Sequence, residues 1–322
     1  MQSTDLYSSV KDDFTAVDAA IIEHLSSHVP LVEKIGQHII ESGGKRLRPL
    51  LVLLAARACG YQQDQHITLA AVIEFIHTAT LLHDDVVDTS DLRRGKPTAN
   101  NKWGNSSSVL VGDFLYSRAF QMLVAIGQLD VMGTISKATN VIAEGEVLQL
   151  LNAKNPDVSE ADYLHVILGK TAMLFEAASQ TGAQLAQAST EEVDALRRFG
   201  RHLGIAFQLI DDLMDYTGDQ EIMGKNVGDD LAEGKPTLPL IHAMAHATGD
   251  ERKLIRKSIR LGSCEHISEI QAILIRCGSL DYTRARAAQE TQDALACLKI
   301  LNDSPYKTSL VDLCTLALAR QN

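Results

Sequence analysis

Residues 204–216 read GIAFQLIDDLMDY, which places three aspartates in a segment that is otherwise almost wholly apolar. A second copy of this DDxxD pattern ends the segment ATLLHDDVVD at residues 79–88. In each copy the first and last aspartates are four residues apart, so on a helix they project from the same face. Segments that are apolar on nearly every side are predicted to be central helices, where unpaired carboxylates would be costly to bury.

Helical periodicity also dominates the rest of the chain, and the alternating patterns typical of strands are nearly absent. We expect Gly43 and Gly44 to close one helix and Pro49 and Pro236 to stand in the first turns of two others. The predicted helices are Thr15–Ser27, Leu31–Ser42, Pro49–Cys59, Thr68–Asp88, Ser107–Ile126, Met132–Asn152, Glu160–Gln187, Glu191–Tyr216 and Pro236–Ala247, followed by about four shorter ones.

These helices predict an all-α fold, a mostly antiparallel bundle around a central cavity. No linker, charge block or internal repeat marks a boundary, so a single domain over residues 1–322 is expected. Polar, glycine-containing loops at 93–105 and 218–235 follow the two acidic motifs, where phosphate clamps or lids are expected.

Composition restricts the partners. A formal net charge of −11 argues against a nucleic-acid partner, which would require a basic face. The five cysteines form no CxxC pair and are typical of core residues in a reducing compartment. No apolar run approaches the roughly 20 residues that span a bilayer, and residues 1–18 resemble neither a signal nor a transit peptide. A cytoplasmic protein without a membrane span is expected.

Carboxylates gathered from two distant segments suit Mg²⁺, which binds one or two protein carboxylates and completes its shell with water and substrate phosphates. For either motif alone, the alternative is a solvated acidic helix face. Two copies, each embedded in apolar sequence and each followed by a basic loop, favour metal binding. The sequence therefore predicts a helical enzyme that handles a diphosphate through Mg²⁺.

A basic segment, GGKRLRP at residues 43–49, is a candidate anion site. Its glycines allow close backbone approach, Lys45 supplies a point charge, and Arg48 offers a planar fork to two phosphate oxygens. The helix expected to begin at Pro49 adds a favourable dipole. The alternative is a helix–helix turn carrying solvated cations.

Further candidates surround the first motif. Arg93 and Arg94 follow it closely enough either to neutralise its aspartates or to reach the same diphosphate. His77 lies two turns before Asp84 on the same side of the predicted helix, although a histidine there is more often a structural core residue. The pair His83–Asp84 also occurs in metal phosphohydrolases, but the accompanying histidine and aspartate are missing.

Other candidates belong to the second motif. Gly169-Lys170-Thr171 interrupts a helical stretch, and Gln208 precedes Asp211 by three residues, so both are expected to point into the same region. Lys225 and Lys235 are candidates to close over a bound phosphate. Taken alone, each would be an ordinary surface lysine.

In this order and spacing, GGKRLRP, LLHDDVVDTSDLRRGKPT, GKT, FQLIDDLMDY and GKNVGDDLAEGKPTLPL resemble the trans-isoprenyl diphosphate synthases over nearly the whole chain. The segments IEFIHTATLLHDDVVD and NVIAEGEVLQL are similar to those of the bacterial members that make octaprenyl diphosphate for quinones. The resemblance implies the isoprenoid synthase fold, a homodimer, and Mg²⁺-dependent condensation of isopentenyl diphosphate with an allylic diphosphate such as farnesyl diphosphate.

The resemblance also implies residue roles. The implied metal ligands are Asp84, Asp88, Asp211 and Asp215. The implied catalytic residues are Asp84, Asp85, Asp88, Asp211, Asp212, Lys170, Thr171 and Gln208. The implied substrate-binding residues are Lys45, Arg48, His77, Arg93, Arg94, Lys170, Thr171, Gln208, Lys225 and Lys235. Among these, Lys45, Arg48, His77 and Arg94 would hold isopentenyl diphosphate, and Thr171 and Gln208 would direct oxygen dipoles at an allylic cation.

Product length should depend on residues one turn before Asp84, because a helical turn rises about 5.4 Å, roughly one isoprene unit. Ala79 and Thr80 are small there, which favours a long product, and Leu123 or Ile135 is expected to form the tunnel floor. Three alternatives remain: a class I terpene cyclase, a metal-dependent phosphohydrolase, and a non-catalytic subunit of a heteromeric synthase.

Overall fold

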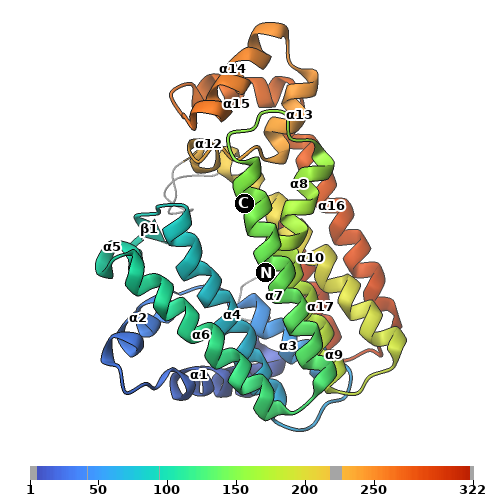
Figure 1. The fold of residues 1–322 in the computed structure, drawn as a ribbon. Helices are drawn as coiled ribbons and strands as arrows, with labels where there is room; N and C mark the ends of the chain where they lie inside the picture. The colour runs from blue at the N-terminus through green and yellow to red at the C-terminus, as the bar shows by residue number, and fades with distance from the viewer. Residues whose placement is uncertain (1–5, 42, 94, 218–226, 320–322) are drawn as a thin grey trace. The chain divides into compact units, whose positions relative to one another are not determined.

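The computed structural model describes residues 6–41, 43–93, 95–217 and 227–319, and these are helical nearly throughout (Figure 1). Within these ranges the only strands are β1 (Leu92–Arg93) and β2 (Lys96–Pro97), which pair antiparallel with Arg93 opposite Lys96. The predicted all-α fold is therefore confirmed.

The helices follow the predicted order with shifted ends. They are η1 (Ser8–Val10), α1 (Lys11–Leu25), α2 (Pro30–Glu41), α3 (Leu47–Ala58), α4 (Gln65–Val87), α5 (Ala99–Trp103), α6 (Asn105–Ile126), α7 (Leu129–Asn152), α8 (Glu160–Ile167), η2 (Leu168–Ala172), α9 (Met173–Leu185), α10 (Thr190–Thr217), α12 (Asp229–Ala232), α13 (Leu238–His246), α14 (Gly249–Leu261), α15 (Ile267–Arg276), α16 (Ser279–Cys297), η3 (Leu298–Ile300) and α17 (Pro305–Ala319).

The observed helix ends test the glycines and prolines that the sequence placed at them. Gly43, which follows α2, has a φ of +80°, a left-handed conformation that glycine adopts without strain, and Pro49 lies in the first turn of α3. The prediction for Pro236 was wrong. Helix α13 begins at Leu238, preceded by extended Thr237, and Pro239 is the first-turn proline.

Two other predictions need correction. The helix predicted over Glu160–Gln187 is divided into α8, η2 and α9, and the interruption indicated by Gly169-Lys170-Thr171 is the π-helical turn η2, Leu168–Ala172. The loop predicted at 93–105 contains the β1–β2 hairpin and α5.

The chain forms two compact units. The first comprises residues 1–139, 174–200 and 297–313, and its centre is α4, which packs against α1, α3 and α6 (Figure 1). Ile73, Phe75 and Leu82 of α4 are completely removed from solvent. The apolar character of α4 on nearly all sides is thus explained by neighbours on several sides.

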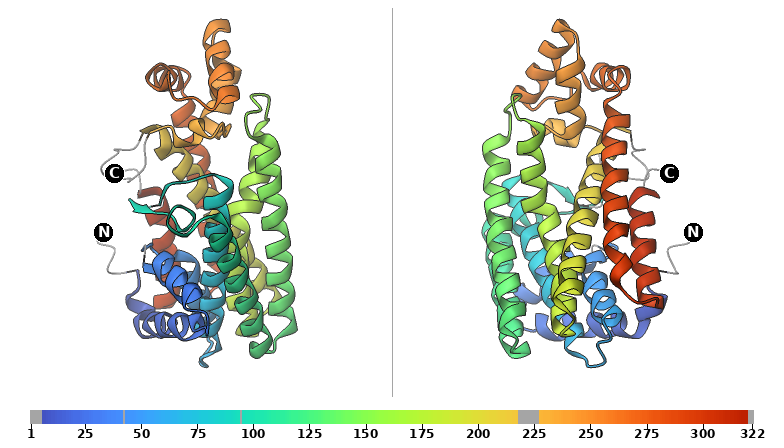
Figure 2. Two further views of the ribbon diagram at one scale, coloured as in Figure 1. Left: turned by 60° about the vertical axis from the view of Figure 1, so that its left-hand side comes forward. Right: turned by 90° about the vertical axis from the view of Figure 1, so that its right-hand side faces the viewer.

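The second unit comprises residues 140–173, 201–296 and 314–322. One apolar cluster joins Tyr163 and Ile167 to Leu209 and Leu213 of α10. Residues of α10 also lie along α16, where His202 Nδ1 is 2.7 Å from a carboxylate oxygen of Glu290 (Figure 2). The predicted single domain over residues 1–322 and its central cavity stay predictions.

Judged by length and composition alone, helices α4 and α6 are long and apolar enough to cross a membrane. Both apolar segments are longer than the sequence analysis expected. Buried core helices of soluble proteins pass the same test, and 67% of the apolar window of α4 is buried. The corresponding share for α6 is 39%, so α6 leaves apolar side chains exposed.

Candidate active site

The first acidic motif stands at the C-terminal end of α4. Asp88 is the C-cap residue, and its backbone nitrogen donates to the carbonyl of Asp84 at 2.8 Å. Asp84 and Asp88 are half-buried, whereas Asp85 is 1% exposed. The predicted four-residue spacing thus leaves two carboxylates accessible on one side of the helix and places the third in the interior.

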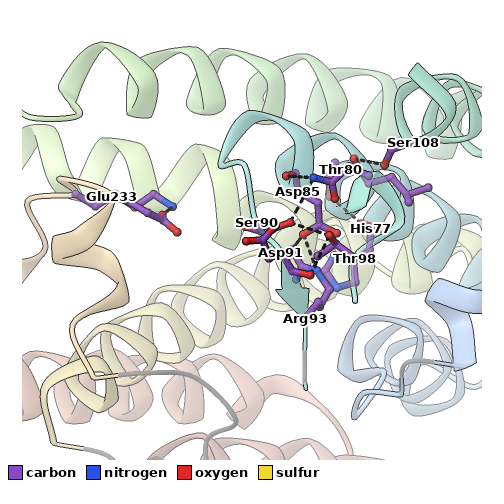
Figure 3. A network of polar contacts seen from close by, with 12 residues as sticks. His77, Thr80, Asp85, Ser90, Asp91, Arg93, Thr98, Ser108 and Glu233 are labelled. Atoms are coloured by element: carbon purple, nitrogen blue, oxygen red, sulfur yellow. Dashed lines mark hydrogen bonds and ion pairs between the residues drawn. The ribbon is translucent and has the colours of Figure 1, made fainter. Parts of the chain in front are cut away.

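The buried carboxylate of Asp85 is held by Arg93 of β1. Arg93 donates from Nε at 3.0 Å and from Nη2 at 2.7 Å to Asp85 Oδ1 (Figure 3). The hydroxyl of Thr98 donates to the Ser90 carbonyl at 2.7 Å, and Asn100 Nδ2 donates to the Asp85 carbonyl at 3.1 Å. The hairpin is therefore tied to the end of α4 through the acidic motif.

Arg93 pairs with an aspartate and remains half-buried next to the motif, which is compatible with both alternatives for the arginines near the motif. The second oxygen of Asp85, Oδ2, is buried without a hydrogen-bond partner. Arg94 lies outside the described residues.

Arg48 and His77, which are 29 residues apart and which the resemblance assigns to the same diphosphate, lie next to each other. Arg48 Nη1 lies 3.3 Å from His77 Nε2, and because arginine only donates, the histidine nitrogen accepts. The guanidinium also stacks 4.4 Å from the centre of the Phe175 ring. Arg48 Nε is buried without a hydrogen-bond partner, which suits an anion-binding role.

Burial lowers the pKa of Arg48 to about 10, and the nearby charge of Glu74 opposes this change. Arg48 therefore stays protonated at neutral pH. Lys45 is exposed at the start of the same segment. Arg46 instead forms an ion pair with Asp18.

His83 has a structural role, as expected from the missing phosphohydrolase residues. Its Nε2 lies 3.2 Å from the carbonyl of Val109 and 3.3 Å from a carboxylate oxygen of Asp113, both on α6. A Cβ on Gly112 would lie 2.3 Å from this nitrogen. His83 thus packs against the glycine side of α6.

The second acidic motif lies near the C-terminal end of α10, in the other unit. Asp211 is half-buried, and Asp212 and Asp215 are 2% and 7% exposed. Asp215 Oδ2 accepts from the backbone nitrogen of Asp230 at 3.3 Å. As in the first motif, the middle aspartate is the most buried of the three.

Asp212 accepts two side-chain hydrogen bonds. The Tyr163 hydroxyl donates to Oδ2 at 2.5 Å and Gln208 Nε2 donates to Oδ1 at 2.7 Å. Burial raises the pKa of Asp212 to about 8, the charge of Asp230 adds to this, and the two hydrogen bonds oppose it. Neither Tyr163 nor Asp230 was identified from the sequence, because nothing in their spacing relates them to Asp212.

Thr171 completes this group by donating from its hydroxyl to Gln208 Oε1 at 2.8 Å. The prediction that the GKT segment and Gln208 point into one region agrees with this contact. Lys170 Nζ lies 2.8 Å from Glu146 Oε2, a partner that the sequence analysis did not identify.

The π-helical turn that carries Lys170 and Thr171 packs tightly against α7. A Cβ on Gly145 would lie 2.7 Å from the backbone nitrogen of Lys170, and one on Gly169 would lie 3.1 Å from Cα of Gly145. Two facing glycines thus allow the backbones to touch at this turn. Isolated π-helical turns occur frequently at functional sites.

Of the two lysines expected to close over phosphate, Lys235 is half-buried and forms an ion pair with Glu233. Lys225 lies outside the described residues. The four residues proposed to set product length are Ala79, Leu123 and Ile135, all at most 1% exposed, and half-buried Thr80, whose hydroxyl donates to the His77 carbonyl at 2.8 Å.

Among the described residues, one group brings three potential metal-ligating side chains within 4.8 Å of one another: His202, Glu290 and Asp293. Two of its members already form an ion pair. Mg²⁺ does not require such a cluster, because it uses few protein carboxylates and takes its remaining ligands from water and phosphate.

Comparison with known proteins identifies the family. Residues 29–275 match the family described as Polyprenyl synthetase. The chain belongs to this family. It is 54% identical to the octaprenyl diphosphate synthase of Escherichia coli K12, with 96% of each chain covered.

Two further relatives extend this result. An all-trans-nonaprenyl-diphosphate synthase (geranyl-diphosphate specific) of Rhodobacter capsulatus is 51% identical, with 98% of this chain and 97% of the relative covered. The crystal structure of polyprenyl synthase from Caulobacter crescentus, complexed with calcium and isoprenyl diphosphate, is 42% identical. It superposes with a TM-score of 0.96 and covers 100% of this chain and 98% of its own.

The chain is therefore an enzyme, a prenyltransferase of the long-chain trans-polyprenyl synthase class with the isoprenoid synthase fold. Enzymes of this class condense isopentenyl diphosphate with an allylic diphosphate and depend on a divalent metal.

Proposed function

We propose that this polyprenyl synthase makes octaprenyl diphosphate by adding isopentenyl diphosphate units to farnesyl diphosphate, and that the product supplies the side chain of ubiquinone. The observation that carries the proposal is the 54% identity, over 96% of both chains, to an octaprenyl diphosphate synthase. A nonaprenyl synthase is 51% identical, so we propose that a few residues along the path of the growing tail set the length of eight units. We further propose a cytoplasmic enzyme without a membrane span.

We also propose that Mg²⁺ is the metal. The donor set consists of aspartate oxygens, the ligands that hard divalent cations prefer, and the orphaned, buried Oδ2 of Asp85 lies beside it. Asp84, Asp88, Asp211 and Asp215 would hold the ions, with Asp85 and Asp212 in support. When bound, the metal would act as a Lewis acid on the diphosphate leaving group.

The protein side chains have complementary roles in the proposed reaction. Arg93, Lys170, Lys225 and Lys235 would direct positive charge at the allylic diphosphate, which favours departure of the leaving group. Lys45, Arg48, His77 and Arg94 would bind the diphosphate of isopentenyl diphosphate. Thr171 and Gln208 would present oxygen dipoles to the positive charge that develops on the allylic carbon, and the apolar helices would exclude water.

Mass spectrometry of the products from labelled isopentenyl diphosphate and farnesyl diphosphate, with Mg²⁺, tests the proposal. We expect eight isoprene units in the main product. A cyclic hydrocarbon would identify a terpene cyclase, and phosphate release without elongation would identify a phosphohydrolase. Turnover only in the presence of a second, different polypeptide would identify a subunit of a heteromeric synthase.

Arg48→Ala should raise the KM for isopentenyl diphosphate about 10- to 100-fold, because a charge-assisted contact contributes about 1.5–3 kcal/mol. Lys45→Ala should act in the same direction, and the KM for the allylic primer should change much less. Arg46→Ala is the matched control, because Arg46 lies in the same segment but forms an ion pair with Asp18. A selective rise in the primer KM would show that Arg48 and Lys45 bind the allylic diphosphate and not isopentenyl diphosphate.

The enzyme is expected to be a homodimer, since closed twofold pairs are the commonest oligomers. Exposed apolar residues of α6 support this expectation, with Leu110 66% and Val124 65% exposed. Light scattering should give twice the 35.1 kDa mass of one chain. Leu110→Arg combined with Val124→Arg should shift the mass toward the monomer, whereas Ile22→Arg, at a 67% exposed site on α1, should not. A monomeric wild-type enzyme at micromolar concentration would contradict the proposal.

A further inference from the structure

Tyr163 stands at the end of a chain of three hydrogen bonds within one unit. Its hydroxyl donates to Asp212 Oδ2 at 2.5 Å, Gln208 Nε2 donates to Asp212 Oδ1 at 2.7 Å, and the Thr171 hydroxyl donates to Gln208 Oε1 at 2.8 Å. Tyr163, Asp212 and Thr171 are 5%, 2% and 8% exposed. Gln208 between them is half-buried. Water therefore has little access to Tyr163, Asp212 and Thr171.

The orientation of the Gln208 amide connects the two ends of this chain. Gln208 directs its nitrogen, which donates, at Asp212 and its oxygen, which accepts, at the Thr171 hydroxyl. The Thr171 proton is then committed to Gln208, and the hydroxyl keeps its oxygen lone pairs for another partner.

We infer that Tyr163 is a positioning residue for prenyl transfer, which sets the orientation of the Gln208 amide and of the Thr171 hydroxyl through Asp212. This inference rests on the proposed roles of Thr171 and Gln208 toward the allylic cation. The ring of Tyr163 belongs to the apolar cluster that contains Ile167 and Leu209, so the hydroxyl is held at a defined place by packing.

The Tyr163 hydroxyl can act on the fold or on the reaction, and the two effects differ in what they change. If Tyr163 only supported the fold, its hydroxyl would change the stability of the enzyme and leave turnover intact. If it orients Gln208 and Thr171, loss of the hydroxyl should lower kcat, because dipoles aimed at developing charge act only when they are correctly oriented. Neither KM should change much, since the hydrogen bond of the Tyr163 hydroxyl goes to Asp212 and not to a residue assigned to a diphosphate by charge.

Tyr163→Phe is the direct test because it keeps the ring and removes only the hydroxyl. We expect kcat to fall about tenfold, which corresponds to a loss of about 1.4 kcal/mol in the transition state, while both KM values stay within about twofold. The matched control is Tyr282→Phe in the same unit. Tyr282 also donates to a carboxylate, Glu160 Oε2 at 2.8 Å, outside this chain of hydrogen bonds. Its turnover should be that of the wild type.

A double-mutant cycle with Gln208→Leu tests the route of the effect. Tyr163→Phe should lower kcat by less than about twofold in the Gln208→Leu background, because the group through which it acts is already missing. Thermal denaturation of each variant verifies that the assayed protein is folded.

An equal fall in kcat in both backgrounds, a change confined to KM, or wild-type kcat in Tyr163→Phe would overturn the inference. Wild-type turnover in Gln208→Leu alone would also overturn it, by rejecting the role of Gln208. Failure of the unmodified enzyme to elongate farnesyl diphosphate is a different result, since it would reject the proposed function itself.

Discussion

Asp84→Ala and Asp211→Ala should each lower kcat about 1,000-fold or more, because Lewis-acid stabilisation of a leaving group contributes several kcal/mol and each 1.4 kcal/mol is about tenfold in rate. Asp84 is half-buried at the end of α4 beside the Asp85–Arg93 pair, and Asp211 is half-buried beside Asp212. Thermal denaturation of both variants should verify that the loss falls on catalysis and not on folding.

Removal of the divalent metal with a chelator should abolish turnover of the unmodified enzyme, and added Mg²⁺ should restore it. Asp64→Ala is a suitable control, since it removes an exposed carboxylate from the opposite end of the helix that bears Asp84. Turnover should be followed with labelled isopentenyl diphosphate. Retention of a tenth of wild-type activity by Asp84→Ala or Asp211→Ala would exclude the proposed metal role of that residue.

Ala79→Tyr should convert the enzyme into a short-chain synthase with products near three or four isoprene units. Ala79 lies five residues, or somewhat more than one turn, before Asp84 on α4, and it is completely buried. A phenol ring at this depth would block a tail that extends along the helix. The diphosphate and metal ligands would be unchanged, so the first condensations should keep their rates.

Ala70→Tyr is the matched control for this change. Ala70 is also completely buried on α4, and its position nine residues earlier places it on the opposite face of the helix. Both variants should lose about 1–3 kcal/mol of stability through overpacking, so folding must be verified for each. Only Ala79→Tyr should shorten the product. An unchanged long product from folded, active Ala79→Tyr enzyme would show that the tail does not pass this position.

The secondary structure and the two acidic motifs could be predicted because both depend on short-range patterns. Apolar periodicity identified α4 and α10 as buried helices, and four-residue spacing placed Asp84 and Asp88 on one side of α4. The GKT segment was identified as an interruption of a helix. The interruption is a π-helical turn, and at this turn Gly145, 24 residues before Gly169, lets the two backbones touch.

The partners of the buried polar groups were decided by tertiary structure. Asp85 is bound by Arg93, Lys170 by Glu146, and Asp212 by Tyr163, which is 49 residues away. A buried carboxylate must find a donor, but the donor is whichever side chain the packing of other helices brings within about 3 Å. The sequence by itself thus determined the helices and the chemistry of the motifs. Only the folded structure determined which side chains orient that chemistry, because such contacts have no periodicity along the chain.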